Sequence, residues 1–339
     1  MNFIPRHEQA RRLGIVIFMR LLVTGGAGFI CSHYVRSVLC DSWGLGPVDE
    51  VVVLDKLTYA GNLANLEPIA RDSRYRFVQG DIANPAIVGP LVKNADIVLN
   101  FAAETHVDRS IVGADDFVRT NIVGTQVLLD AVKEFGVEKF IQVSTDEVYG
   151  SIDEGSWTEE SPLLPNSPYS AAKASGDLLA RAYFGTHDLP ISVTRCSNNY
   201  GPYQFVEKVI PLFVTNLMQG KKVPLYGDGL NIRDWLHVDD HCRAIHLVAL
   251  GGKAGEIYNI GGGTELTNKE LTDRLLKANG ADWSSVQYVQ DRPGHDRRYS
   301  LDHSKITREL GYEPKWNLDE GLAQTIKWYQ DNQSWWKKN

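Results

Sequence analysis

The fold of this chain is decided by the stretch Arg20-Leu21-Leu22-Val23-Thr24-Gly25-Gly26-Ala27-Gly28-Phe29-Ile30. A short apolar strand runs into a glycine-rich turn, and we expect a helix to continue from the turn to about Ser42. Glycines let the backbone approach a diphosphate, which the free N–H groups and the positive end of the helix dipole stabilise. The stretch therefore predicts a dinucleotide site at Gly25, Gly28, Phe29 and Ile30.

The glycine pattern of this turn is incomplete. The spacing Gly-x-x-Gly-x-x-Gly would place its third glycine at position 31, and the chain has Cys31 there. A glycine at that point normally allows the helix to pack closely on the strand. Because cysteine is small and apolar, we expect Cys31 to be tolerated with a modest shift.

Strands and helices alternate along the rest of the first half. Apolar or β-branched runs predict strands over 50–55, 76–82, 96–103, 140–143 and 191–195, and helical patterns cover 115–135 and 169–187. This alternation predicts an α/β fold with a doubly wound parallel sheet. Composition shifts after position 200, so we expect an N-terminal extension over 1–18, a dinucleotide-binding domain over 19–200, and a smaller substrate domain over 201–339 that is partly interleaved with the first.

Acidic residues close two of the expected strands. Asp55 ends the second strand, where a carboxylate accepts hydrogen bonds from the adenosine ribose and repels a 2′-phosphate. The sequence therefore favours NAD over NADP, with the neighbouring Lys56 as the one contrary feature. Asp81 ends the next strand and is a candidate adenine contact. Small or polar residues expected close to the cofactor further along are Ala102, Ala103 and Thr120.

A compact acid/base set follows the strand at 140–143. It consists of Ser144-Thr145-Asp146-Glu147-Val148-Tyr149-Gly150, followed by Tyr169 and Lys173. Residues at i and i+4 share one helix face, and a nearby ammonium favours the phenolate, so Tyr169 could serve as a base. A tyrosine and lysine also occur at this spacing by chance, and an Asp-Glu pair is usually a solvated turn. The order of strand, hydroxyl, carboxylates and helix, downstream of a dinucleotide signature, favours catalysis.

Composition limits the remaining classes of function. The 339 residues carry a net charge of −7, with 23% charged and 43% hydrophobic residues, which is ordinary for a soluble enzyme of two domains. The acidic balance argues against nucleic acid as a partner, because phosphate binding relies on clustered Lys and Arg. Four cysteines without framework spacing predict reduced thiols and a cytoplasmic location. The apolar run 13–18 is too short for a membrane span and lacks a cleavage site, so no membrane association is expected.

Two polar motifs occur in the second half. His237-Val238-Asp239-Asp240-His241-Cys242 has two histidines at i,i+4 spacing, as in some metal sites, but no further His or Cys cluster accompanies it. A helix start without metal is therefore the favoured interpretation. The densest basic patch is 292–299, which could be a solvated face or could neutralise a diphosphate in this acidic chain.

With these residues in view, the chain resembles the extended short-chain dehydrogenase/reductases and, within them, the dTDP-glucose 4,6-dehydratase family, from Met19 to about Trp336. The motifs that carry the resemblance are Thr24–Ile30, Asp55-Lys56-Leu57-Thr58-Tyr59-Ala60-Gly61-Asn62, Ala103-Glu104-Thr105-His106-Val107-Asp108-Arg109-Ser110, Ser144–Gly150 and Arg292-Pro293-Gly294-His295-Asp296. The glycine-rich turn and the Tyr and Lys pair belong to the whole superfamily. The Asp-Glu doublet is the part on which the dehydratase resemblance most depends.

The resemblance implies an NAD-dependent lyase that converts dTDP-glucose to dTDP-4-keto-6-deoxyglucose. Tyr169 would take the proton of the 4-hydroxyl while hydride passes to NAD, Lys173 would hold the cofactor ribose, and Thr145 would hydrogen-bond the reacting oxygen. Glu147 would then remove the proton of carbon 5, and a protonated Asp146 would protonate the departing 6-hydroxyl before hydride returns to carbon 6.

The same resemblance implies further contacts. The cofactor would be bound by Gly25, Gly28, Phe29, Ile30, Asp55, Lys56, Thr58, Asp81, Ile82, Ala102, Ala103, Thr120, Tyr169, Lys173 and Asn198. The nucleotide sugar would be bound by His106, Thr145, Asn199, Lys208, Val209, Pro224, Tyr226, Arg233, Asn268, Arg292 and His295. The family is usually a homodimer through two helices per subunit, here 115–135 and 169–187.

Three rival functions share parts of this pattern. A nucleotide-sugar 4-epimerase of the UDP-glucose type has the same fold, NAD, Tyr and Lys, but it needs no acid/base pair beyond the tyrosine, so Asp146-Glu147 favours loss of water. A GDP-mannose-type dehydratase is disfavoured because Asp55 disfavours NADP. A non-catalytic nucleotide-sugar-binding regulator could lose Tyr169 or Glu147, and both are present. The preference for dTDP over UDP or CDP follows from the resemblance alone.

Overall fold

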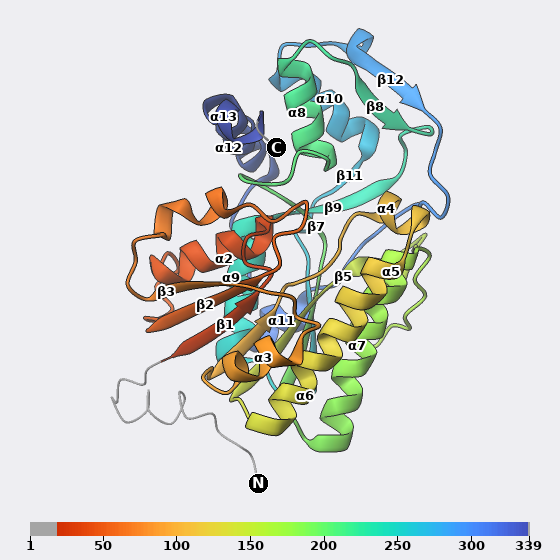
Figure 1. The fold of residues 1–339 in the computed structure, drawn as a ribbon. Helices are drawn as coiled ribbons and strands as arrows, with labels where there is room; N and C mark the ends of the chain where they lie inside the picture. Colours follow the sequence, from red (N-terminus) through yellow and green to blue (C-terminus); the bar gives the residue numbers. More distant parts are fainter. Residues whose placement is uncertain (1–18, 338–339) are drawn as a thin grey trace.

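The computed structural model describes residues 19–337, so the predicted N-terminal extension over 1–18 lies outside the described residues. A seven-stranded sheet forms its centre, in the order β10-β6-β5-β4-β1-β2-β3 (Figure 1). All neighbouring strands of this sheet pair in parallel. In chain order the strands are β1 (Arg20–Thr24), β2 (Glu50–Asp55), β3 (Tyr75–Gln79), β4 (Ile97–Asn100), β5 (Lys139–Thr145), β6 (Ile191–Cys196) and β10 (Ile257–Ile260).

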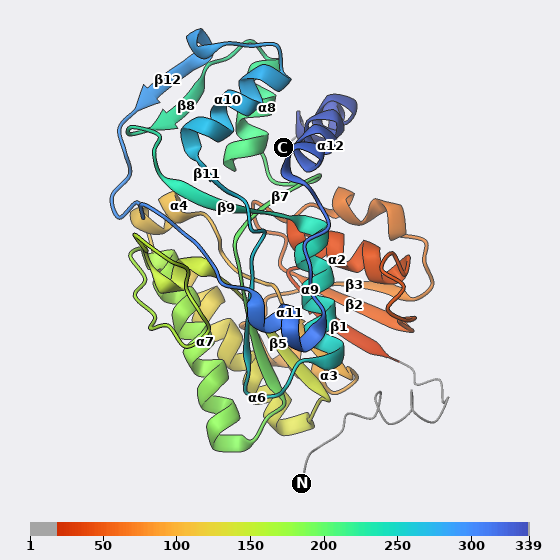
Figure 2. The ribbon, with the colours of Figure 1, turned by 180° about the vertical axis from the view of Figure 1, so that it is seen from behind.

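Helices cover both faces of this sheet (Figures 1 and 2). One face carries α3 (Pro85–Val92), α6 (Thr125–Phe135) and α7 (Pro168–His187), and the other carries α2 (Phe29–Leu39), α9 (Val238–Gly251) and α11 (Ser304–Leu310). Strand β2 shows why the sheet is apolar on both sides, since Val51 and Val53 pack into one core and Val52 and Leu54 into the other. The predicted doubly wound α/β fold is confirmed.

Two helical segments beside the sheet bear on the site. The polar stretch at 104–110 enters the short helix α4 (Val107–Val112), which His106 caps by accepting a hydrogen bond from the Arg109 N–H. The predicted helix over 115–135 consists of α5 (Asp115–Phe117), a π-helical segment (Val118–Gly124) and α6. Single π-helical turns in an α-helix often accompany functional sites, and this one places Thr120 at the cavity described below.

A smaller lobe lies beyond the carboxyl ends of the sheet (Figure 1). Its helices are α8 (Val209–Met218), α10 (Asn268–Ala278), α12 (Leu318–Asp331) and α13 (Gln333–Trp336). Its strands form two small sheets, β7 (Asn198–Tyr200) with β9 (Ile232–His237) and β11 (Glu265–Thr267), and β8 (Val223–Tyr226) with β12 (Val286–Val289). Pro224 and Tyr226, both implied as substrate contacts, therefore lie in strand β8.

The chain crosses between the lobes more than once. After β9 it returns to the large sheet, where α9 packs against α2 and β10 pairs with β6. Helices α12 and α13 then lie in the smaller lobe. These crossings place loops from both lobes around the carboxyl ends of β1, β2, β4, β5 and β6, the edge at which open α/β sheets bind ligands.

Candidate active site

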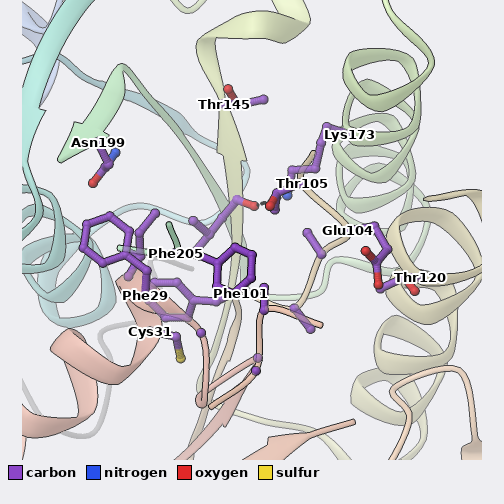
Figure 3. Close-up of a pocket in the computed structure, with 18 of the residues that line it drawn as sticks. Phe29, Cys31, Phe101, Glu104, Thr105, Thr120, Thr145, Lys173, Asn199 and Phe205 are labelled. Atoms are coloured by element: carbon purple, nitrogen blue, oxygen red, sulfur yellow. Dashed lines mark hydrogen bonds between the residues drawn. The ribbon is translucent and has the colours of Figure 1, made fainter. Parts of the chain in front are cut away.

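A cavity of about 300 Å³ lies at the carboxyl ends of the parallel strands. In Figure 3 Phe29 and Asn199 lie on one side of it and Glu104 and Thr120 on the other. All fifteen residues predicted to bind the cofactor line this cavity, together with Thr145, Asp146 and Glu147. Tertiary structure has thus collected residues from the first glycine turn to β7 in one place.

The glycine turn is built to receive a diphosphate. Gly25 has φ of +74°, and a Cβ added there would lie 2.8 Å from the Ala102 backbone, so the position demands glycine. Helix α2 begins at Phe29 with no side-chain cap and no acidic residue in its first turn among the described residues. Its positive end is therefore free to meet an anion in the cavity.

Cys31 is accommodated at the place of the missing glycine. Its side chain is 2% exposed and packs in the core between α2 and the sheet, and its thiol points at the Thr24 carbonyl with an S–O distance of 3.6 Å. The first turn of α2 keeps its hydrogen bonds, since Ser32 N donates to Gly28 O at 3.0 Å. Burial of the apolar Cys31 side chain therefore offsets the modest cost expected from having cysteine in place of glycine.

The far end of the cavity carries the acids predicted to bind adenosine. Asp55 accepts hydrogen bonds from Ala27 N (2.9 Å) and Leu57 N (2.7 Å), which fix its carboxylate beside the glycine turn. Lys56 pairs with Asp81 (3.1 Å), and Arg119 approaches the same carboxylate (3.6 Å). Lys56, the one feature that suggested NADP, is thus engaged by an acid, which leaves Asp55 as the residue that fits a ribose diol.

The two adjacent carboxylates occupy different environments. Thr145 is the last residue of β5, and Asp146 and Glu147 open a 3₁₀ turn that ends at Tyr149. Asp146 is 2% exposed; burial and then the Glu147 carboxylate raise its pKa well above the usual value. Its Oδ1 accepts from Thr145 Oγ1 (3.1 Å), and its Oδ2 has no partner within residues 19–337. An aspartic acid so placed keeps its proton and can donate it.

Glu147 has cations around it that Asp146 largely lacks. Burial raises the pKa of Glu147, and the charges of Arg292, Arg233 and Lys208 oppose that rise. Of the two carboxyls, Glu147 is therefore the one whose ionised form the surrounding cations favour, whereas burial and the Glu147 charge favour the protonated form of Asp146. Opposed protonation states in neighbouring carboxyls are what paired acid and base catalysis requires.

Tyr169 and Lys173 lie on the first turns of α7, which Ser167 caps by accepting from Ser170 N. Both side chains are buried and line the cavity. The expected lowering of the Tyr169 pKa by Lys173 does not hold for the protein alone. Burial and then the Glu147 carboxylate raise the pKa of Tyr169, a hydrogen bond with Thr145 opposes that rise, and the Lys173 ammonium donates to the Val143 carbonyl (2.6 Å).

The residues predicted to bind the nucleotide sugar divide into two groups. Thr145, Asn199 and Lys208 line the cavity itself. The other eight lie beside α4 or in the smaller lobe: His106, Val209, Pro224, Tyr226, Arg233, Asn268, Arg292 and His295.

Several contacts connect this second group. Arg292 lies 3.6 Å from Asp108, which also accepts from the Tyr226 hydroxyl (3.5 Å), and the His295 ring meets the Tyr226 ring edge-on at 6.4 Å. Arg233 lies over the Tyr299 ring and donates to the Asp296 carbonyl. The charges of Arg233 and Arg292 reach Glu147, which lines the cavity.

Three segments that line the cavity are held together by side-chain contacts, and Lys208 is the one member of these contacts that was predicted as a site residue. The Arg109 guanidinium lies 3.7 Å from the centre of the Tyr59 ring and donates to Glu207 at 3.0 Å. Phe205 meets the same tyrosine edge-on at 5.7 Å. Lys208 donates to the Thr105 carbonyl at 3.0 Å. We call Tyr59, Arg109 and Glu207 the clasp.

Other cavity residues were also missed. Cys196, Gln204 and His241 line the cavity, and no pattern in the sequence marked the first two. His241 was noted only as half of a possible metal motif. The other histidine of that motif, His237, stacks on Trp316 at 4.2 Å and contacts Gln324, whereas His241 contacts Asn199. The two rings therefore contact different residues. Residues 19–337 contain no group of His, Cys, Asp or Glu arranged to hold a metal ion.

Comparison with known proteins gives consistent matches. The family model described as GDP-mannose 4,6 dehydratase matches residues 22–325. A dTDP-glucose 4,6-dehydratase from Streptomyces antibioticus is 60% identical over 94% of this chain and 95% of its own length. The crystal structure of the dTDP-glucose 4,6-dehydratase DesIV from Streptomyces venezuelae, with NAD bound, superposes with a TM-score of 0.93 at 61% identity, covering 94% of this chain and 99% of that one.

An epimerase is similar at greater distance. The UDP-glucose 4-epimerase of Thermotoga maritima has a TM-score of 0.84 at 33% identity, covering 93% of this chain and all of the epimerase chain. The shared fold is thus common to both activities, and the higher identity lies with the dehydratases.

Proposed function

We infer the reaction from one premise: the chain belongs to the GDP-mannose 4,6 dehydratase family and, within it, to the dTDP-glucose 4,6-dehydratases. It is an NAD-dependent hydro-lyase that converts dTDP-glucose to dTDP-4-keto-6-deoxyglucose and water. The observation that carries this conclusion is the adjacent pair Asp146 and Glu147 in the cavity: burial raises the pKa of Asp146 well above its usual value, and nearby cations oppose the rise at Glu147.

We propose the following roles for the first half of the reaction. Tyr169 removes the proton of the sugar 4-hydroxyl, and Thr145, whose hydroxyl hydrogen-bonds Tyr169, orients the reacting oxygen. Lys173 holds the cofactor ribose and supplies positive charge near the phenol. NAD supplies a reversible hydride acceptor when it is bound, and its net consumption is zero.

In the second half the carboxyls act. A ketone at carbon 4 acidifies the hydrogen on carbon 5, and Glu147 removes that proton as the base. Asp146 donates its proton to the 6-hydroxyl, which leaves as water. Carbon 6 then receives the hydride that was taken from carbon 4, and Glu147 returns its proton to carbon 5. The proton that Tyr169 took from the 4-hydroxyl balances the one that Asp146 gave up. The two transfers need opposite protonation states at neighbouring positions, which the burial of Asp146 and the cations near Glu147 support.

We propose that the smaller lobe binds the dTDP portion. Lys208, Arg233 and Arg292 supply the charge for its diphosphate, Asn199 and His106 lie toward the sugar, and Tyr226 and His295 lie toward the base. Val209, Pro224 and Asn268 border the same face through α8, β8 and α10. In this division residues 19–200 form the NAD-binding domain and 201–339 the nucleotide-sugar domain, with α9 and β10 returning to the first.

We propose further that two copies associate through the helices over 115–135 and 169–187. Apolar side chains on and beside these helices are exposed: Val112 (92%), Leu178 (52%), Val118 (46%) and Val123 (40%). Contiguous exposed apolar patches commonly mark interaction surfaces. Replacing Leu178 with Arg should halve the mass measured by light scattering, and an unchanged mass would reject this interface.

We propose a cytoplasmic location, supported by four cysteines that are all free. No helix within the described part of the chain has the length and apolar character needed to cross a bilayer.

The test of the reaction follows the hydrogen on carbon 4. The purified enzyme is incubated with dTDP-glucose deuterated there, without added cofactor, and the product is analysed by mass spectrometry and NMR. Deuterium should appear on the methyl group of the product. Loss of the label to solvent, or its retention at carbon 4, would refute the scheme. Parallel incubations with the UDP and CDP sugars measure the base preference.

A further inference from the structure

His241, in the first turn of α9, is a buried histidine that the proposed reaction does not use. Its side chain is 0% exposed and lines the cavity. Its Nδ1 lies 2.9 Å from Asn199 Oδ1, and its Nε2 has no hydrogen-bond partner among the described residues. A buried ring nitrogen left unpaired at a cavity wall requires an explanation, since such atoms usually find a partner.

The neighbouring amide fixes which nitrogen carries the proton. Asn199 Nδ2 donates to the Ser197 carbonyl (2.9 Å) and to Cys196 Sγ (3.4 Å), so its Oδ1 is the atom that faces the histidine. An amide oxygen only accepts, and therefore His241 Nδ1 carries the hydrogen. Burial lowers the pKa of His241 to about 3, so the ring is neutral near neutral pH. It follows that Nε2 offers a lone pair to whatever occupies the cavity.

A second unpaired acceptor flanks the same asparagine. Gln204 Nε2 donates to the Asn199 backbone carbonyl (2.9 Å), while Gln204 Oε1 has no partner within residues 19–337. Gln204 is 8% exposed and also lines the cavity. Two buried acceptors beside Asn199 are thus left without a donor among the described residues. The ligand that fills this part of the cavity has to bring N–H or O–H groups.

The position of this wall identifies which end of the dinucleotide reaches it. Asn199 contacts Cys196, and the charge of Lys173 influences the pKa of the Cys196 thiol, so the wall lies on the side of the catalytic helix α7. The hydride acceptor must lie beside Tyr169, whereas Asp55 and Asp81 lie at the adenosine end. The nicotinamide half is therefore the half next to His241. Its carboxamide carries two N–H donors on one nitrogen, and these match two acceptors.

We propose that His241 Nε2 and Gln204 Oε1 accept hydrogen bonds from the carboxamide of NAD and so orient the nicotinamide ring. Neither residue is among the fifteen assigned to the cofactor. The proposal rests on the use of NAD in the proposed function. Sugar hydroxyls could also satisfy the two acceptors, and the experiment separates them from the carboxamide.

The experiment measures binding rather than turnover. Cofactor-free enzyme is titrated by calorimetry with NAD and with its acetylpyridine analogue, in which a methyl group replaces the amide nitrogen. The wild type should bind the analogue about tenfold more weakly, which is about 1.4 kcal/mol, because a buried acceptor loses its donor. In His241→Phe the ratio of the two dissociation constants should fall toward one, because NAD loses one of its two contacts and the analogue does not; the Gln204 contact accounts for the remaining difference.

Two further variants serve as a second test of the carboxamide contact and as a control. Gln204→Met should reduce the ratio by itself, which tests the proposal if His241→Phe folds poorly. His187→Phe replaces an exposed histidine at the far end of α7 and should leave the wild-type ratio.

The possible outcomes distinguish an error in the carboxamide contact from an error in the proposed function. An unchanged ratio in His241→Phe and Gln204→Met, with normal turnover of dTDP-glucose, would overturn the carboxamide contact and leave the proposed function standing. Weaker binding of dTDP alone would assign the two acceptors to the sugar nucleotide and would also overturn it. A cofactor-free enzyme that bound neither dinucleotide would contradict the function itself.

Discussion

Replacing Glu147 with Gln should separate the two halves of the reaction. The amide has the shape of the carboxylate and can still accept from Ser170 Oγ, which lies 3.4 Å from Glu147 Oε2. It cannot take a proton from carbon 5. The variant should therefore oxidise dTDP-glucose and then stop, so that reduced cofactor and the 4-keto sugar accumulate on the enzyme.

The size of the effect follows from the role of the residue. A positioned general base contributes about 10²–10⁴ in rate, so the rate of dehydrated product should fall by that factor, or about 3–5 kcal/mol in activation free energy. The oxidation half should change in the other direction. The Glu147 charge raises the pKa of Tyr169, so its removal should move the pH dependence of oxidation toward lower pH.

The assay is a single turnover in which near-ultraviolet absorbance reports reduced cofactor and mass spectrometry reports the sugar. Glu160→Gln, a change at an exposed glutamate in the loop before α7, is the matched control and should behave as the wild type. If Glu147→Gln released dehydrated product at the normal rate, Glu147 would not be the base. If it failed to reduce bound cofactor, the residue would act earlier than we infer.

Three further perturbations test other parts of the structure. Asp146→Asn should slow elimination about 10²-fold or more because the acid is lost. The raised pKa of Asp146 also lowers the stability of the wild type above pH 3.8, so the variant should melt at a higher temperature than the wild type near neutral pH and at the same temperature near pH 3. Equal melting temperatures at both pH values would reject a buried, protonated Asp146. Cys31→Gly should leave NAD affinity within about twofold of the wild type. It should lower the free energy of unfolding, measured in urea, by about 2 kcal/mol because buried apolar surface and helix propensity are lost. Weaker NAD binding would show that the thiol supports the turn. Arg109→Ala should release NAD about fivefold to tenfold faster in a dilution experiment, because the clasp loses an ion pair and a cation–π contact. Arg274→Ala, which removes a remote ion pair, is the control. An unchanged rate of NAD release in Arg109→Ala would exclude the clasp from cofactor retention.

The sequence determined the fold and identified fifteen residues that line one cavity at the carboxyl ends of the strands. A glycine at position 25 is needed because of its positive φ and its contact with Ala102, and such local demands are visible in a short motif. Apolar runs of five or six residues indicated the buried strands, and acids at strand ends had to meet at one edge because parallel strands end together. The fifteen cofactor residues were predicted for these reasons and by resemblance, and all of them line one cavity.

The tertiary structure decided the protonation states and the residues contributed by distant segments. Asp146 and Glu147 are neighbours in sequence with the same chemistry. Burial raises the pKa of both, but Arg292, Arg233 and Lys208 oppose the rise at Glu147, whereas the Glu147 charge adds to the rise at Asp146. Lys173 was expected to lower the pKa of Tyr169, but the effects of burial and the carboxylates are larger. His241 and Gln204 reach the cavity because α9 and the loop after β7 return to it, and no local pattern encodes that return. The protonation state and burial of a side chain depend on the groups that folding brings within several ångströms of it, so they can be inferred only from the tertiary structure.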